Sequence, residues 1–168
     1  MIDFQELDKQ LKGKGIDLDR VTDRLGRPIE PKIKPLLIVL NSKGYRTTAS
    51  CEGHSLSDWK ERMAHRVSLG KARLVNEGKR GLVYEIRSEE GRRTTQSFYA
   101  HPWVDLDLIE QQVKRLGRIV HSHNESERVH WYLEEYSDFH RLEAEPSHDL
   151  EVLQADIPRL EEYIYLLG

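Results

Sequence analysis

The sequence predicts an α+β fold, with helices packed on one face of a mixed or mostly antiparallel sheet. Some segments repeat apolar residues at helical spacing, and others alternate apolar with polar residues as strands do. Glycine and proline turn signals separate these segments, and the helices are unevenly distributed along the chain. A chain of 168 residues usually forms one domain, so we expect a single domain over residues 1–168.

The first 30 residues are expected to form a peripheral arm, with a short helix over residues 3–11. A stronger helix is predicted over residues 31–43, where apolar residues form one stripe. Pro35 suits the first turn of this helix, and Gly44 suits the left-handed residue that follows its last turn.

The middle of the chain begins with a strand over residues 45–50 and a weakly amphipathic helix over residues 57–66. Residues 82–87 and 94–99 then predict a β-hairpin. The segment from 55 to 100 is basic and precedes the next strong strand, so we interpret it as an insertion.

The next segment predicts a strand over residues 101–106. Asp107 is expected to cap a helix that Gly117 ends, and residues 118–123 predict a further strand.

The last third of the chain predicts a hairpin of residues 129–133 with 139–144. Two helical stretches follow, residues 147–155 and 157–167, and we expect the helical segment to break or bend at Pro158.

Charge is distributed unevenly along the chain, whose net charge is −3. Residues 60–99 contain ten lysines and arginines against five glutamates, whereas residues 124–168 contain three basic against twelve acidic residues. Such an asymmetry can steer an anionic partner to the basic segment, or let the two segments attract each other. Both interpretations stay open.

The setting of the protein is expected to be cytoplasmic. The single cysteine cannot form an internal disulfide, and no apolar run approaches the length that spans a bilayer. The first residues also lack the apolar core of a signal peptide. We therefore expect no membrane partner, and the oligomeric state is left open.

The residues from Ser50 to His54 carry the densest chemistry in the chain. Cys51 offers a nucleophilic thiolate, and His54 can supply positive charge or act as a base. Glu52 can orient the imidazole, and Gly53 permits a turn that other residues resist. We predict Cys51, His54 and Glu52 as catalytic residues, the alternative being that Cys51 only packs at the end of a strand.

Other residues are predicted to bind a ligand at the same place. Ser50, Gly53 and Thr48 lie at this strand end, and His101 begins a strand that is a candidate sheet neighbour. Cys51, His54 and His101 would then form a zinc site with one open position.

A second pair of histidines, His121 and His123, would share one face of the strand expected over residues 118–123. Both rings would then reach one metal ion, although a surface pair without metal is the alternative.

The basic segment over residues 60–99 is a candidate nucleic-acid interface. Its cations would contact phosphates, and the aromatic rings of Trp59, Tyr84, Phe98 and Tyr99 would stack on unpaired bases. The alternative is a solvated hairpin and helix held by pairs of opposite charges.

The motif also resembles known families. Ser50 to His54, after Leu40-Asn41 and Gly44 and before Pro102-Trp103-Val104, resembles small uncharacterised bacterial and phage proteins with a Ser-Cys-Glu-Gly-His signature. This resemblance covers residues 33–54 and 101–116 and implies no particular activity.

A more distant resemblance is to the transfer-RNA methyltransferase family of wybutosine synthesis, which has a Ser-Ser-Cys-Ser-Gly-Arg run. Ser50, Cys51 and Gly53 match that run, whereas Glu52 and His54 replace its serine and arginine. The resemblance implies S-adenosylmethionine as a cofactor.

These observations favour an intracellular protein with an active or ligand site at the Ser50–His54 turn, acting on a small molecule, a nucleotide or an RNA base. The alternatives are a non-catalytic binding or assembly module with a zinc site, and a nucleic-acid-binding accessory protein.

Overall fold

The computed structural model describes residues 1–23 and 26–168. Within them, five α-helices and seven strands form two antiparallel sheets, which confirms the α+β class. The chain divides into two compact units, Met1–Glu52 with Pro102–Gly168, and Gly53–His101. The second unit spans nearly the range that we interpreted as a basic insertion. The assignment to a single domain stays a prediction.

The first unit contains a four-stranded sheet in the order β1-β5-β7-β6. The strands are β1 (Arg46–Cys51), β5 (Trp103–Asp107), β7 (His140–Ala144) and β6 (Trp131–Glu135). Cys51 pairs with Trp103 at one end of β1 and β5, and Val104 pairs with Leu142 in the centre of the sheet. The predicted hairpin near residues 129–144 is confirmed by the pairing of β6 with β7.

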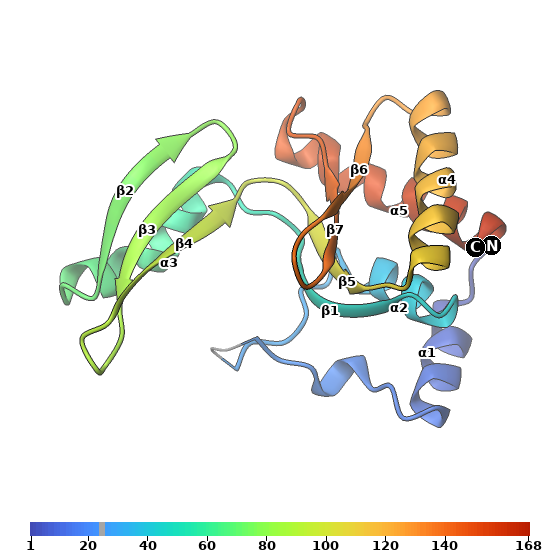
Figure 1. Ribbon diagram of the computed structural model, residues 1–168, viewed down its shortest axis with the longest axis horizontal. Helices are drawn as coiled ribbons and strands as arrows, with labels where there is room; N and C mark the ends of the chain where they lie inside the picture. The colour runs from blue at the N-terminus through green and yellow to red at the C-terminus, as the bar shows by residue number, and fades with distance from the viewer. Residues whose placement is uncertain (24–25) are drawn as a thin grey trace. The chain divides into compact units, whose positions relative to one another are not determined.

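Helices of the first unit pack on one face of this sheet (Figure 1). They are α2 (Lys34–Ser42), α4 (Glu110–Ser126) and α5 (Leu150–Leu167). The helix α1 (Phe4–Gly13) packs against α2, and a short 3₁₀ helix follows at Leu18–Arg20. The predicted helices near residues 3–11 and 31–43 are confirmed. Gly44 has φ +85°, the left-handed conformation expected after α2.

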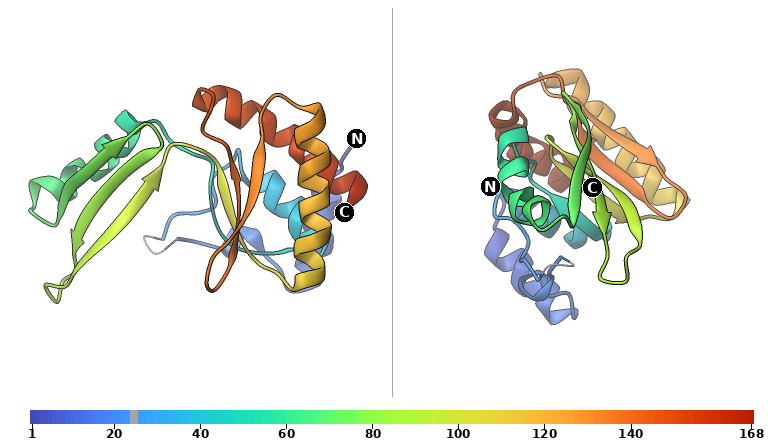
Figure 2. Two further views of the ribbon diagram at one scale, coloured as in Figure 1. Left: turned by 45° about the horizontal axis from the view of Figure 1, so that its top comes forward. Right: turned by 90° about the vertical axis from the view of Figure 1, so that its left-hand side faces the viewer.

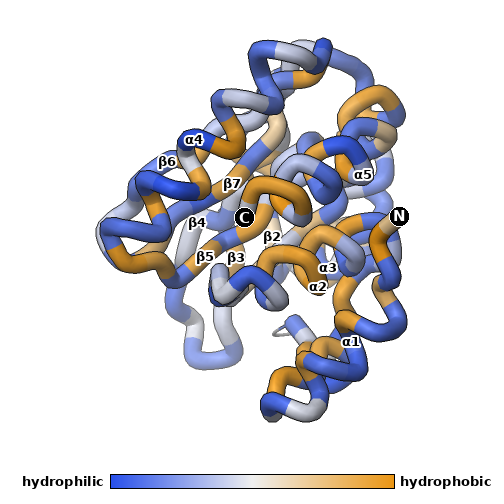
Figure 3. The backbone as a smooth tube through the Cα atoms, turned by 90° about the vertical axis from the view of Figure 1, so that its right-hand side faces the viewer, coloured by the Kyte–Doolittle hydropathy of each residue, from blue (hydrophilic) through white to orange (hydrophobic). Residues whose placement is uncertain are grey.

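The core of the first unit lies between the helices and the sheet. Figure 3 shows hydrophobic positions concentrated along α2. The largest fully buried side chains there include Trp131, Tyr45, Ile33, Leu36, Leu40, Leu106, Leu116, Leu142, Leu153 and Ile157. The segment expected to be a peripheral arm contributes Leu11 and Leu18 to this core.

The second unit consists of α3 (Leu56–Ser68) and a three-stranded sheet (Figure 2). Its strands are β2 (Ala72–Gly78), β3 (Gly81–Arg87) and β4 (Arg93–Tyr99), in the order β2-β3-β4. The predicted hairpin of β3 with β4 is confirmed. β2 was not expected from the sequence, because Ala72 is its one buried residue and gives no alternating pattern.

The prediction of a strand over residues 118–123 is wrong, because these residues continue α4 through Gly117. Leu116, Ile119, Val120 and His123 are buried at helical spacing. Gly117 costs a helix interior about 1 kcal/mol relative to alanine, and the burial of this face outweighs that cost.

Two further boundaries differ from expectation. Asp107 ends β5 and pairs with Arg46, while α4 begins at Glu110, where the side chain of Gln112 accepts a hydrogen bond from the N–H of Ile109. Of the break or bend expected at Pro158, the break is absent, since α5 runs as one helix from Leu150 to Leu167 with Pro158 inside it.

Of the helices in residues 1–23 and 26–168, none combines the length and the apolar character that crossing a membrane requires.

Candidate functional site

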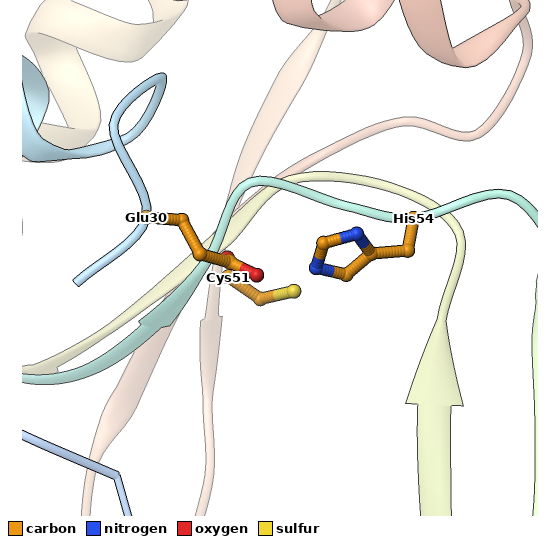
Figure 4. A group of neighbouring side chains, drawn as sticks. All are labelled: Glu30, Cys51 and His54. Atoms are coloured by element: carbon orange, nitrogen blue, oxygen red, sulfur yellow. The ribbon is translucent and has the colours of Figure 1, made fainter. Parts of the chain in front are cut away.

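Three side chains with metal-binding atoms converge where β1 ends. One ligand atom each of Glu30, Cys51 and His54 lies within 4.8 Å of the other two. Figure 4 shows the carboxylate, the sulfur and the imidazole pointing toward one another. Cys51 is 6% exposed and His54 is 7% exposed, so the cluster is largely shielded from water.

The turn after β1 sets the approach of His54 to Cys51. Gly53 has φ +82°, as the motif predicts, and this left-handed conformation reverses the chain between the two side chains. Any other residue at this position would strain the backbone, so the glycine is required by the geometry of the site.

Asp58 holds the imidazole of His54. Its Oδ2 atom lies 2.9 Å from Nδ1 of His54, four residues earlier in the chain. Asp58 stands in the first turn of α3, where the hydroxyl of Ser55 accepts a hydrogen bond from the N–H of Asp58. Because Nδ1 is engaged by a carboxylate, Nε2 is the ring nitrogen suited to a metal.

Glu30 is held in place by the backbone of the motif itself. The N–H of Glu52 donates a hydrogen bond of 2.8 Å to Oε2 of Glu30. The carboxylate of Glu52, predicted to orient His54, accepts a hydrogen bond from the N–H of Lys32. The backbone carbonyl of Glu52 accepts a hydrogen bond from the side-chain amide of Gln154. Glu52 therefore ties the motif to residues near Glu30 and to α5, and Asp58 is the carboxylate paired with His54.

The remaining predicted ligand residues occupy different positions. Ser50 is half-buried on β1 and Thr48 is exposed. His101 is buried and packs against Tyr99, with ring centroids 5.2 Å apart. The third donor of the cluster is Glu30 instead of the predicted His101.

The sequence showed no signal for Glu30, which is 21 residues from Cys51 and reaches it only through the fold. Asp58 had a local signal, since a serine followed three residues later by an acidic residue is typical of a helix start, and this one begins directly after His54.

The second histidine pair does not form a metal site. His121 and His123 lie on α4, where residues two apart point to nearly opposite sides. His121 is exposed and lies 3.3 Å from Glu125, whereas His123 is fully buried with Nε2 3.0 Å from Asp156. The expectation failed because it depended on a strand.

Comparisons with protein-family models, with curated proteins and with solved structures find no match to this chain. The resemblances of the Ser50–His54 motif therefore stay predictions, and the function must be inferred from the cluster of Glu30, Cys51 and His54.

Proposed function

We propose that Glu30, Cys51 and His54 bind one zinc ion, and that the protein is a zinc-dependent enzyme. The observation that carries the proposal is the convergence of a thiol sulfur, an imidazole and a carboxylate within 4.8 Å. Sulfur, nitrogen and oxygen donors of these three kinds are the ones that zinc takes in proteins. Magnesium and calcium prefer oxygen alone.

The three ligand atoms are close enough to bind one metal ion after a small movement. Tetrahedral ligands at zinc distances lie roughly 3.3–3.8 Å apart, so atoms already within 4.8 Å need to move by about 1 Å. The hydrogen bonds from Glu52 to Glu30 and from His54 to Asp58 orient two of the ligands from outside the cluster.

The carboxylate of Glu30 favours metal binding over the nucleophilic role predicted for Cys51. A thiolate and a carboxylate are both anions, and two anions this close repel each other in a shielded site. A divalent cation between them reverses that repulsion. A cysteine that acts as a nucleophile is instead typically placed beside positive charge.

Three protein ligands are the number found in catalytic zinc sites, where the fourth position holds water or substrate. Zinc there lowers the pKa of bound water and polarises carbonyl or phosphoryl oxygens. Hydrolysis is therefore the reaction class that this donor set supports, and a nucleotide or a nucleic-acid base stays the proposed substrate. We propose hydrolysis in place of methyl transfer from S-adenosylmethionine, because only the distant resemblance implies methyl transfer.

The test is the metal content of protein purified without a histidine tag. We expect about one zinc per chain, and X-ray absorption should show one sulfur and two or three nitrogen or oxygen neighbours. Cys51→Ser and Glu30→Gln should each lower the zinc content at least tenfold, while His121→Ala, which removes an exposed histidine, should leave it unchanged. Full zinc occupancy in the Cys51→Ser protein would refute the site.

The open position is tested with cobalt in place of zinc. Added azide should change the visible spectrum of the cobalt protein if an exchangeable position exists. A spectrum unaffected by azide, together with unfolding when the metal is removed, would show a structural zinc and refute the enzyme.

A further inference from the structure

The second unit presents one face of its sheet without a covering helix. α3 packs on the other face, where Trp59, Met63, Leu82 and Tyr84 are buried. The indole N–H of Trp59 donates a hydrogen bond of 2.9 Å to the carbonyl of Tyr99, which fixes α3 to β4. Side chains that alternate with Leu82 and Tyr84 therefore lie on the opposite face, which we call the outer face.

The register of the three strands identifies the residues of the outer face. Glu85 on β3 pairs with Arg73 on β2 and Thr95 on β4. Val83 pairs with Asn76 and Ser97, and Arg87 pairs with Arg93. Gly81 pairs with Tyr99 on the same face. The outer face thus carries three arginines, one glutamate and Tyr99 among small polar and methyl-bearing side chains.

The arginines of this face are directed outward by their surroundings. Arg73 and Arg93 lie 3.6 and 3.8 Å from Glu85, one on each side of it. Their side chains are 72% and 61% exposed, whereas that of Glu85 is 27% exposed. A single half-buried carboxylate between two exposed guanidinium groups leaves the face positively charged.

Both ends of the sheet add positive charge. Lys79 and Arg80 form the turn between β2 and β3. At the opposite end Arg92 precedes β4, beside Arg87 and Arg93; Glu89 and Glu90 lie in the same turn, with Glu90 3.9 Å from Arg92, so three arginines outnumber two glutamates there. Strands of seven residues span roughly 20 Å. The cations therefore form two groups, Lys79 and Arg80 at one end and the arginines around Glu85 at the other, separated by a central region of uncharged side chains.

Three of the four aromatic residues expected to stack on unpaired bases pack inside the unit. Trp59 and Tyr84 are buried, and both rings contact Phe98, at centroid distances of 4.9 and 5.7 Å. These three rings lie between the sheet and α3, so they cannot stack on the bases of a single strand. For these three rings the expectation was wrong. Tyr99 pairs with Gly81 on the outer-face side of β4, and its ring packs against His101. The other side chains of the outer face are suited to contacts with phosphates and base edges.

We propose that the outer face of β2-β3-β4 binds duplex DNA by lying in the major groove. The major groove of B-form DNA is about 12 Å wide and admits β-ribbons, whereas that of duplex RNA is too narrow for side chains to read. Three strands about 4.8 Å apart span roughly 10 Å, so the sheet fits between the walls of the groove when its strands run obliquely along it. Its two positively charged ends then approach the two phosphate backbones. Asn76, Thr95 and Ser97 then face base edges.

This proposal is independent of the zinc site, because no outer-face residue is a proposed ligand. The experiment measures fluorescence anisotropy of a labelled 24-base-pair DNA with the full-length protein at several salt concentrations. We expect binding whose affinity falls with salt, and a triple variant with Arg73, Arg87 and Arg93 changed to glutamine should reduce the slope by about 2.7. At low salt the affinity of this variant should fall at least tenfold.

The matched control changes Lys60, Arg62 and Arg66 of α3 to glutamine, which removes the same charge from the other side of the unit. It should retain affinity within about threefold. An equal loss in the two triple variants, or equal affinity for single-stranded DNA or duplex RNA, would overturn the proposal. The Cys51→Ser protein should bind DNA with the same dependence of affinity on salt as the unchanged protein. The experiment therefore distinguishes an incorrect zinc site from an incorrect DNA interface.

Discussion

Replacing Glu161 with glutamine should stabilise the protein above neutral pH and leave its stability nearly unchanged in acid. Glu161 lies on the inner side of α5, between the buried residues Ile157, Leu160 and Ile164, and only 4% of it is exposed. Burial, and to a smaller extent the neighbouring charge of Glu162, raises the pKa of the Glu161 carboxyl from 4.5 to about 7. The carboxyl is therefore neutral in the folded protein at pH values where it is ionised in the unfolded chain.

The raised pKa determines both the sign and the size of the effect. Well below pH 4.5 the carboxyl is protonated in both states, and its ionisation does not affect the free energy of unfolding. As the pH rises through 4.5 to about 7, the unfolded chain loses its proton first, so the folded state becomes less stable. One pKa unit corresponds to about 1.4 kcal/mol, and the loss above pH 7 reaches roughly 3 kcal/mol.

The assay is urea unfolding of the Glu161→Gln protein and the original protein at pH 4.5 and pH 8. Other titrating groups are common to both proteins, so the difference between them isolates Glu161. We expect a difference within about 0.5 kcal/mol at pH 4.5 and a gain of roughly 2–3 kcal/mol for the variant at pH 8. Glu162→Gln, at the exposed neighbouring position, should stay within about 0.5 kcal/mol at both pH values. A difference for Glu161→Gln that does not change with pH would refute the reasoning.

Three other substitutions test separate features. Asp58→Asn should weaken zinc binding 10- to 100-fold in a chelator competition, because it removes the carboxylate that orients His54; unchanged affinity would exclude this positioning role. Gly53→Ala should lower the free energy of unfolding by about 1–2 kcal/mol, as φ +82° disfavours a side chain, and a neutral result would contradict that turn. Asp105→Asn should lower the free energy of unfolding in urea by about 3 kcal/mol, because Arg141 donates to both carboxylate oxygens at 2.6 and 3.0 Å and both side chains are 11% exposed. As a control, Asp107→Asn at an exposed ion pair should cost under 1 kcal/mol. Equal losses would show that burial does not strengthen the Asp105–Arg141 pair.

Local patterns were sufficient for the parts of the fold in which one segment determines its own structure. Gly44 and Gly53 both have the positive φ that their positions after a helix and after a strand predict. The hairpin of β3 with β4 was likewise predictable, because alternating residues and a tight turn are short-range features.

The sequence patterns gave a wrong prediction where a local signal for a helix end and a strand lies inside a longer amphipathic helix. Gly117 followed by the β-branched residues Ile119 and Val120 looks like a helix end and a strand, but the four buried positions of α4 lie at helical spacing across Gly117. Propensity is a weak preference, and packing against the core of the first unit overrides it here.

The candidate site likewise contains residues that the sequence predicted and one that it did not. Cys51, Gly53 and His54 are close in sequence, and their association was predictable. Glu30 belongs to a loop whose path depends on the hydrogen bond to the backbone of Glu52, and no spacing in the chain encodes that contact. Whether Cys51 is a nucleophile or a metal ligand depends on the carboxylate of Glu30. The role of Cys51 could therefore be assigned only once the fold was known.

The pairing of Cys51 with Trp103 has a consequence for how this gene can change. Residues 52 and 102 flank two antiparallel neighbours, so a tight reverse turn of a few residues could join them directly. Deleting the intervening 49 residues would leave every strand pair of the larger sheet in register. Shorter and longer versions of this chain could therefore exist by loss or gain of a module at a single hairpin, and the shorter ones would lack His54 unless the replacement turn restored it.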